Sequence, residues 1–238
     1  MRFLDLTLPT AAENLALDEA LLLAAEDGPG GAVLHLWQNP TPAVVLGAGG
    51  SVAIDVNVPA CEADGVPILR RASGGGTVLL GPGCLCFSVV LAYSSAPALD
   101  QILASNRYVL GRVLTAVRRV APLASVEGTS DLAVDGVKFS GNAQQRKRSH
   151  FLHHGTLLCG FDLSLIPRYL NPPERHPEYR RARPHAAFVG NLPADVETVA
   201  RLLVDEWQPD GEYGPMPWEM IRALIAAKYA VDEWNKRR

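Results

Sequence analysis

The chain has 238 residues, of which 48% are hydrophobic, and a formal net charge of −3. This length and apolar content suffice for one domain with a sizeable core, or one domain with an appendage. The negative balance argues against a general nucleic-acid-binding protein, since such proteins carry a broad excess of Lys and Arg. No apolar run approaches the roughly 20 residues of a membrane-spanning helix, and the first residues lack the pattern of a secretory signal. We therefore expect a cytoplasmic protein that binds neither nucleic acid nor membrane.

The cysteines, histidines and basic residues carry weaker signals. The four cysteines form no CxxC pair, so buried free thiols are expected. His150, His153 and His154 do not predict a metal site, because on a strand position 153 points away from the other two. Basic side chains gather in two stretches that could face a nucleotide phosphate, an acidic partner protein or only solvent. These stretches hold Lys138, Arg146, Lys147 and Arg148, and then Arg175, Arg180, Arg181 and Arg183.

The first half of the chain predicts a helix followed by strands. Residues 11–27 have the spacing of an amphipathic helix, and Thr10 is placed as its N-cap. A glycine-rich run lies between two predicted strands, where ligand-binding loops are commonly found. The predicted strands of this half are 32–37, 43–47, 66–70 and 84–91, with a short helix near 58–63.

The second half predicts a long helix and a β-hairpin. Apolar spacing indicates a core-facing helix over 99–120. An Asp135-Gly136 turn then joins residues 131–134 to a strand that begins at Val137, which is typical of a hairpin. Residues 150–159 are expected to form a third strand of this unit. Further helices are predicted near 164–170, 194–207 and 218–234.

This order of elements indicates an α+β fold, with mixed or antiparallel sheets flanked by helices. Residues 1–190 are expected to form the main domain. Residues 191–238 then form a short helical appendage rather than a full second domain.

The run from Arg70 to Thr77 and Lys138, about sixty positions later, carry the strongest chemical signal. Glycines reach positive φ and let backbone N–H groups approach an anion directly. The two arginines add permanent cations, and Ser73 adds a hydroxyl donor. The chain has no GxxxxGK[ST], GxGxxG, HExxH or GxSxG motif. The combination predicts an acyl-activating site in which a mobile ammonium holds the transferred group.

Six segments in this order resemble the lipoate-protein ligase family, within the wider group of biotin and lipoate ligases and octanoyltransferases. The resemblance covers residues from about 14 to 163 and implies a biotin/lipoate ligase-like catalytic domain. Biotin ligases are less similar, because the run at 70–76 lacks their GRGR character. The segments are Asn14–Leu21, Leu36–Pro40, Arg70–Gly76, Gly128–Leu132, Lys138–Gln144 and His153–Leu158.

The resemblance implies a two-step reaction. Lipoate attacks the α-phosphate of ATP, bound with Mg²⁺, to give lipoyl-AMP and pyrophosphate, and the acyl group then passes to a lysine of a lipoyl domain. Lys138 would be catalytic, because an ammonium can stabilise the charge that builds on phosphate and acyl oxygens. Arg70 and the glycines should surround the carboxylate and adenylate, Trp37 and His154 should line the acyl pocket, and Asp131 and Asn142 should touch the nucleotide region. The complete set of expected binding residues is Trp37, Arg70, Arg71, Ser73, Gly74, Gly75, Gly76, Thr77, Asp131, Ser140, Gly141, Asn142, Ala143, His154, Gly155 and Thr156.

Two alternatives to a ligase stay open. An octanoyltransferase or lipoyl amidotransferase would carry the acyl group on a cysteine thioester without ATP. The positions where transferases place that cysteine correspond here to Pro173 and to Ser125–Ser130, and neither region contains cysteine. Cys84 and Cys86, which share one strand face, replace polar residues of many ligases, so their role is open. A non-catalytic protein that binds lipoyl or biotinyl compounds is the second alternative, although it would have no need for Lys138.

The family resemblance also bears on partners. Classical ligases add a separate C-terminal accessory domain, whereas only about seventy residues follow Leu170 here. We expect that a separate accessory polypeptide supplies the missing part, or that this subclass works without it. Lipoyl-domain proteins are the expected acceptors.

Overall fold

The computed structural model describes residues 1–238 except 29, 174–176, 182 and 238. Its centre is a five-stranded sheet in the order β1-β2-β6-β11-β10. The β1 and β2 strands are parallel, and the other neighbours are antiparallel. The strands are β1 (Arg2–Asp5), β2 (Val33–Gln38), β6 (Cys84–Ala92), β10 (Asn142–Arg146) and β11 (His150–Leu158).

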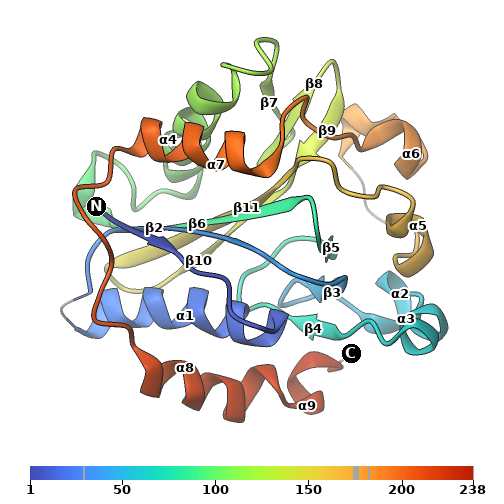
Figure 1. Ribbon diagram of the computed structural model, residues 1–238, viewed down its shortest axis with the longest axis horizontal. Coiled ribbons are helices and arrows are strands. Elements are labelled where there is room, and N and C mark those ends of the chain that lie inside the picture. The colour runs from blue at the N-terminus through green and yellow to red at the C-terminus, as the bar shows by residue number, and fades with distance from the viewer. Residues whose placement is uncertain (29, 174–176, 182, 238) are drawn as a thin grey trace.

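Helices cover both faces of this sheet (Figure 1). On one face lies α1 (Ala11–Asp27), with α8 (Trp218–Leu224) packed on its outer side, and on the other lie α4 (Ile102–Val117) and α7 (Val196–Trp207). Alternate side chains of β6 therefore enter different cores. Cys84, Cys86 and Val90 join the core on the α1 face, and Leu85, Phe87, Val89 and Leu91 join the core on the α4 face.

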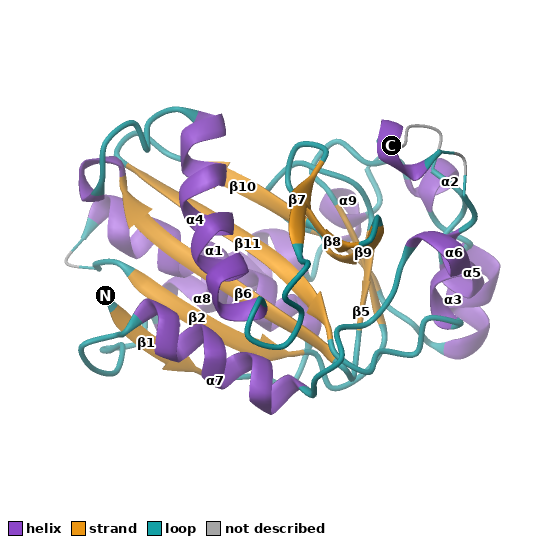
Figure 2. Cartoon of the chain, turned by 90° about the horizontal axis from the view of Figure 1, so that it is seen from above, coloured by secondary structure: helices purple, strands orange, loops and turns teal. Residues whose placement is uncertain are grey.

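Two three-stranded sheets lie at one end of the main sheet (Figure 2). One has the order β4-β3-β5, with β4 (Ile68–Arg70), β3 (Ala43–Leu46) and β5 (Val78–Leu80). The other has the order β7-β8-β9, with β7 (Ser125–Glu127), β8 (Asp131–Val134) and β9 (Val137–Ser140). The glycine-rich run joins β4 to β5, and Lys138 lies on β9, so both predicted site segments are at this end.

Short elements complete the described part of the chain. The helices are α2 (Val52–Asp55), α3 (Val58–Asp64), α5 (Leu165–Tyr169), α6 (His185–Phe188) and α9 (Asp232–Asn235), with a π-helical turn at Ile225–Tyr229 and 3₁₀ turns at Tyr93–Ser95 and Glu178–Arg180. No helix in the described ranges combines the length and apolar character needed to cross a membrane.

The start of α1 follows its sequence signal. The Thr10 hydroxyl accepts a hydrogen bond from the Glu13 N–H, and the Glu13 carboxylate accepts one from the Thr10 N–H. This reciprocal capping box satisfies two N–H groups that have no partner inside the helix. It confirms the predicted helix start.

Two predicted elements differ in the structure. The strand β11 was expected in the hairpin unit but lies in the main sheet, because it pairs with β6 on one side and with β10 on the other. The helix predicted over 218–234 is interrupted by the π-helical turn and ends locally at Ala230–Val231 before α9. The predicted domain division at residue 190 stays a prediction; α7 packs in the same core as α4.

Candidate functional site

Two adjoining cavities lie where residues of the three sheets meet. The first has a volume of about 230 Å³ and an apolar wall that includes Leu15, Trp37, Val45, Leu80 and Phe87. The second, of about 570 Å³, is lined by apolar side chains and also by polar groups that include Ser51, Asp55, Ser140, Asn171 and Arg180. The residues that line both cavities are Gly76, Thr77, Val78, Lys138, Gly141 and Thr156.

Lys138 therefore stands at the boundary between the two cavities. Its Nζ lies 2.8 Å from Asp131 Oδ1, and the Tyr179 hydroxyl donates a hydrogen bond of 2.8 Å to Asp131 Oδ2. Burial and the neighbouring Asp131 charge raise the pKa of Tyr179, so this hydroxyl stays a donor. A Cβ at Gly141 would lie 3.1 Å from Lys138 Nζ, so glycine leaves room for the ammonium.

The side chain of Arg71 forms hydrogen bonds with other residues of the glycine-rich run. Its Nη2 donates to the carbonyls of Gly74 and Gly76 at 2.6 and 2.8 Å, and its Nε donates to Ser73 Oγ. Burial lowers the pKa of Arg71 to about 10, which leaves it protonated at neutral pH. Because C=O and N–H of a planar trans peptide point in opposite directions, the Gly75 and Thr77 N–H groups point away from the carbonyls that Arg71 holds.

Those N–H groups suit an anion. Among the described residues, the N–H groups of residues 75–77 donate to no protein acceptor. Gly75 has a φ of +90°, a conformation that L side chains rarely adopt. Successive unpaired backbone donors of this kind form a concave site for phosphate or carboxylate oxygens.

The structure corrects the role predicted for Arg70. Its side chain is fully buried and does not line either cavity. The guanidinium donates instead to backbone carbonyls of Gly47, Gly50, Trp234 and Arg237. Arg71, not Arg70, lies beside the first cavity. Successive residues of an extended segment point in opposite directions, so only one of the two arginines can face the cavity.

A buried polar chain links α1 to the glycine-rich run. Ser73 Oγ lies 2.6 Å from His154 Nε2, and His154 Nδ1 lies 3.4 Å from Asp18 Oδ2. The other oxygen of Asp18 lies 2.9 Å from His35 Nδ1. Burial alone would raise the pKa of Asp18, but hydrogen bonds from His154 and His35, together with their charges, hold it well below its usual range.

Asp18 and His35 are not among the site residues that the sequence predicted. Asp18 is one of several polar residues in a predicted helix, and His35 lies within a predicted strand. No local spacing connects them to residue 154. A carboxylate on the sheet-facing side of an amphipathic helix is the only sequence signal that could have found Asp18, since such groups are rarely buried without a partner.

The first cavity also has polar atoms that lack a protein partner. Trp37 Nε1, Ser88 Oγ and Asn142 Oδ1 are buried without one, although Asn142 Nδ2 donates to the Ser130 carbonyl and Ser140 Oγ. Buried polar groups are normally hydrogen-bonded, so these atoms are available to a ligand. Gly155 gives Asn142 its space, because a Cβ at position 155 would collide with Asn142 Oδ1.

The cysteines and histidines occupy different surroundings. Cys84 and Cys86 are buried on the same face of β6, as predicted, and Cys86 lines the first cavity. Burial raises the pKa of Cys86 well above its usual value, with the neighbouring Cys84 adding to the effect, so it is a thiol rather than a thiolate. His153 lies beside Gln144 and Phe87, away from His154. In the described ranges, no group of three or more His, Cys, Asp or Glu side chains could hold a metal ion.

The two basic stretches are dispersed in the structure. Arg180 lines the second cavity, and Arg183 donates to the Gly136 carbonyl in the hairpin turn. Arg146 stacks on Tyr93 and Phe151, away from both cavities. Arg148 and Arg181 are both exposed, and Arg175 lies outside the described residues.

Most of the predicted site residues come together. Ser73 and Gly74 are held by Arg71 behind the first cavity, and Ser140 borders the second. The remaining predicted residues other than Arg70 line the first cavity, namely Trp37, Arg71, Gly75, Gly76, Thr77, Asp131, Lys138, Gly141, Asn142, Ala143, His154, Gly155 and Thr156.

Several solved structures share this fold. A bipartite lipoate protein ligase from Thermoplasma acidophilum has a TM-score of 0.82 and 23% identity, covering 99% of this chain and 95% of that chain. A putative lipoate protein ligase from T. acidophilum with bound lipoic acid has a TM-score of 0.81 and 22% identity, covering 99% and 98%. A lipoate-protein ligase A bound with ATP has a TM-score of 0.76 and 21% identity, covering 99% and 98%. These likenesses confirm the predicted fold class.

Sequence comparison gives the family. The chain is 34% identical over 158 residues to a probable lipoate-protein ligase A of Mycoplasma pneumoniae, covering 66% of this chain and 45% of that protein. A probable lipoate-protein ligase A of Mycoplasma genitalium is 33% identical over 160 residues, covering 66% and 46%. The chain thus spans about half the length of these curated relatives. Because residues 10–207 match the model of the lipoyl protein ligase A/B catalytic domain, the chain belongs to that family, as its motifs predicted.

Proposed function

We propose that this protein is a lipoate-protein ligase, which activates lipoate with ATP to lipoyl-AMP and transfers the lipoyl group to a lysine of a lipoyl domain. The observation that carries the proposal is the position of Lys138 at the boundary of two adjoining cavities, one with an apolar wall and a larger one that Arg180 and several hydrogen-bonding side chains border. An acyl adenylate has one apolar arm and one polar arm. Its mixed anhydride would lie at the junction.

The first cavity fits the acyl arm. Its wall of aliphatic and aromatic side chains removes methylene groups from water, which contributes about 0.8 kcal/mol for each buried CH₂. Lipoate and octanoate share an eight-carbon chain, so this wall alone does not distinguish them. Relatives named as probable lipoate-protein ligases favour lipoate.

The second cavity fits the nucleotide arm. The guanidinium of Arg180 is a permanent cation suited to phosphate, and Ser51, Ser140 and Asn171 offer hydrogen-bonding groups. Bound Mg²⁺ would neutralise phosphate charge. Asp55 at the second cavity and Asp131 at the first offer carboxylate oxygens, which fits an ion that binds through one or two carboxylates and phosphate oxygens.

The chain's own residues account for both chemical steps. When a carboxylate oxygen of lipoate attacks the α-phosphorus, the bond to pyrophosphate breaks, and negative charge grows on the phosphate oxygens beside Lys138. When a neutral lysine amine attacks the acyl carbon, the bond to AMP breaks and the amine loses its proton. Lys138 and the unpaired N–H groups of residues 75–77 would stabilise the oxyanion in each step, because they are already oriented.

The partner is an acceptor lipoyl domain in the same compartment, which we propose is the cytoplasm. The similar T. acidophilum ligase is described as bipartite and as part of a system with its E2 lipoyl domain. An accessory polypeptide is part of the proposal, because that similar ligase is described as bipartite.

Lipoate-dependent exchange of labelled pyrophosphate into ATP tests the first step, and lipoylation of a purified lipoyl domain tests the second. Exchange supports the ligase, and its absence, with the accessory polypeptide tested as well, would contradict it. A stable thioester formed from octanoyl carrier protein would instead indicate a transferase. Lipoate binding with neither reaction would indicate a non-catalytic binding protein.

A further inference from the structure

Arg70 joins a distant segment to the loop that borders the second cavity. Its Nη1 donates to the Gly47 carbonyl at 3.0 Å and to the Gly50 carbonyl at 2.7 Å. Its Nη2 donates to the Arg237 carbonyl at 2.6 Å, and its Nε donates to the Trp234 carbonyl at 3.1 Å. One buried guanidinium therefore binds the backbone of two segments that are far apart in the sequence.

The turn at residues 47–50 needs such a restraint. Three of its four residues are glycine, which has more backbone freedom than any other residue. Gly49 and Gly50 line the second cavity, and the Ala48 N–H donates to the Ser73 carbonyl at 2.8 Å. Gly47 packs so closely on the Gly75 carbonyl that a Cβ would collide with it. Movement of the turn would therefore change the wall of the second cavity. It would also disturb the glycine-rich run, which the turn contacts.

The other side of Arg70 is held by residues 218–237, which we call the clamp segment. The Trp234 Nε1–H donates to the Arg70 carbonyl at 2.8 Å, and Asn235 Oδ1 accepts from the Arg70 N–H at 3.0 Å. Lys228 Nζ lies 4.2 Å from the centre of the Trp234 ring, and the Arg237 guanidinium lies 3.8 Å from it. Backbone and side chain of Arg70 thus both contact this segment.

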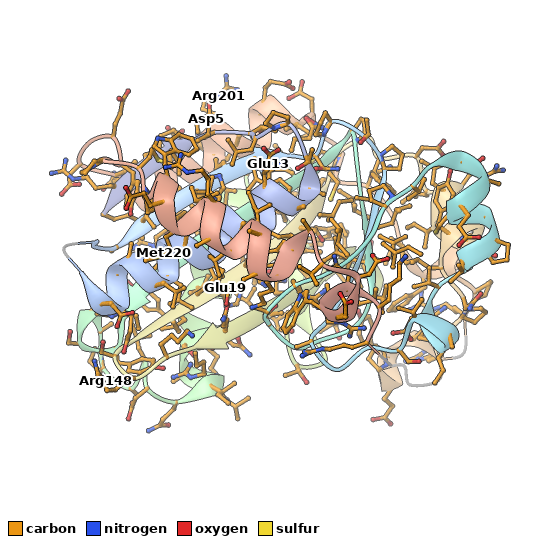
Figure 3. The ribbon with its side chains drawn as sticks, turned by 90° about the horizontal axis from the view of Figure 1, so that it is seen from below. Asp5, Glu13, Glu19, Arg148, Arg201 and Met220 are labelled. Atoms are coloured by element: carbon orange, nitrogen blue, oxygen red, sulfur yellow. The ribbon has the colours of Figure 1, made fainter. Side chains whose placement is uncertain are left out.

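The clamp segment is itself attached to the main domain. Glu19 on α1 accepts hydrogen bonds from Lys228 Nζ and the Tyr229 hydroxyl, each at 2.7 Å. Figure 3, seen from below, shows α8 of the clamp segment in front of α1, and α1 contacts both α8 and the π-helical turn. Asn235 Nδ2 donates to the Tyr229 carbonyl at 2.8 Å, which connects this anchor to the contacts around Arg70.

We propose that Arg70 is a positioning residue for the nucleotide, and that the clamp segment holds it in place. The guanidinium fixes the Gly47–Gly50 turn as one wall of the second cavity, so nucleotide affinity depends on contacts made outside the cavity. The proposal rests on the proposed function, because it assigns that turn to the nucleotide side of an acyl-adenylating site. Arg70 is not among the residues that line the first cavity, so acyl binding should be spared.

Two variants test the clamp without adding bulk. Trp234→Phe keeps an aromatic ring but removes the donor to the Arg70 carbonyl. Arg70→Lys keeps the charge but lacks the planar fork that reaches several carbonyls at once. We expect KM for ATP to rise about tenfold in Arg70→Lys, equivalent to about 1.4 kcal/mol, and to rise by less in Trp234→Phe. The kcat and the KM for lipoate should change little. Lys236→Ala, which removes an exposed pair with Asp232, is the matched control and should change none of these constants.

Hydrogen exchange of the ligand-free protein gives a readout that does not need activity. Amides of residues 47–51 should exchange faster in Trp234→Phe and Arg70→Lys than in the wild type, while those of β6 and β11 stay protected. The proposal would be overturned if amide exchange at residues 47–51 were unchanged in both variants. It would also be overturned if KM for lipoate rose as much as KM for ATP and kcat fell by the same factor. If the wild type shows no lipoate-dependent pyrophosphate exchange, the ligase assignment fails, and the hydrogen exchange result still decides whether the clamp exists.

Discussion

The Lys138 ammonium on β9 and the Asp131 carboxylate on β8 form an ion pair at 2.8 Å across the hairpin. The register between these strands shifts at Leu132/Ala133, and the Tyr179 hydroxyl holds the second oxygen of Asp131. The hairpin therefore supplies both the ammonium and the group that orients it. This places a compact cation at the boundary of the two cavities, where an acyl phosphate would lie.

Lys138→Arg should be nearly inactive although the charge is kept. A planar guanidinium cannot place its donors where a compact ammonium sits. Loss of one preorganised donor typically costs on the order of 3 kcal/mol, or more than a hundredfold in rate. The measurement is lipoate-dependent pyrophosphate exchange.

Lys147→Arg is the control, because Lys147 lines neither cavity. It should retain the wild-type rate. Wild-type exchange in Lys138→Arg would refute the catalytic assignment.

Cys86→Ala should retain pyrophosphate exchange, whereas Cys86→Phe should lose lipoate binding. The alanine variant removes a buried thiol whose high pKa makes it a poor nucleophile, and the phenylalanine variant fills part of a cavity of about 230 Å³. Steady-state kinetics with lipoate as the varied substrate checks both.

Cys159→Ala, a buried cysteine that lines neither cavity, controls for loss of a core thiol. Complete loss of acyl transfer in Cys86→Ala, with Cys159→Ala active and both folded, would revive the thioester route.

Local patterns predicted much of this fold. The start of α1, the hairpin turn and the two faces of β6 follow from capping, turn chemistry and strand alternation, which depend on near neighbours. The glycine-rich run and Lys138 could be assigned to one site because six ordered segments resemble a family. The short strands β1, β5, β7 and β10 were missed, since three to five residues carry little periodic signal.

The errors concern contacts between distant segments. The roles of Arg70 and Arg71 depend on which side of β4 faces the cavity, and that depends on residues 234–237, more than 160 positions away. The Asp18, His35 and His154 chain likewise joins three elements. β11 belongs to the main sheet because it pairs with β6, a distant segment, and with β10, which carries no apolar pattern. Tertiary packing decided these features, so a linear pattern could not.

The stability that Asp18 contributes should depend on acidity. Its folded-state pKa is depressed by hydrogen bonds from His154 and His35, which outweigh the effect of burial. The contribution is therefore fully present above the unfolded-state pKa of about 3.9 and is lost as pH falls through the lower folded-state value. Asp18→Asn should lower the free energy of unfolding by about 3–5 kcal/mol at pH 7, as breaking a buried pair does, and by less below pH of about 4. Urea unfolding at several pH values measures this, with the exposed Asp27→Asn as control. An equal deficit at neutral and acidic pH would contradict the assignment.

Gly155→Ala should damage the site through a single methyl group. The new Cβ would collide with Asn142 Oδ1 and come within 2.8 Å of the Phe87 ring, so β11 or the Asn142 side chain must move. Overpacking of this kind typically costs about 1–3 kcal/mol, and displacement of Asn142 should also weaken ligand binding in the first cavity. Gly111→Ala is the matched control. It lies in α4 with open space around a new Cβ, and it should stabilise the protein by up to about 1 kcal/mol through helix propensity. Urea unfolding gives the first effect and lipoate titration by calorimetry gives the second. If Gly155→Ala were as stable as the wild type and bound lipoate equally well, the close packing of β10 against β11 would not shape this cavity.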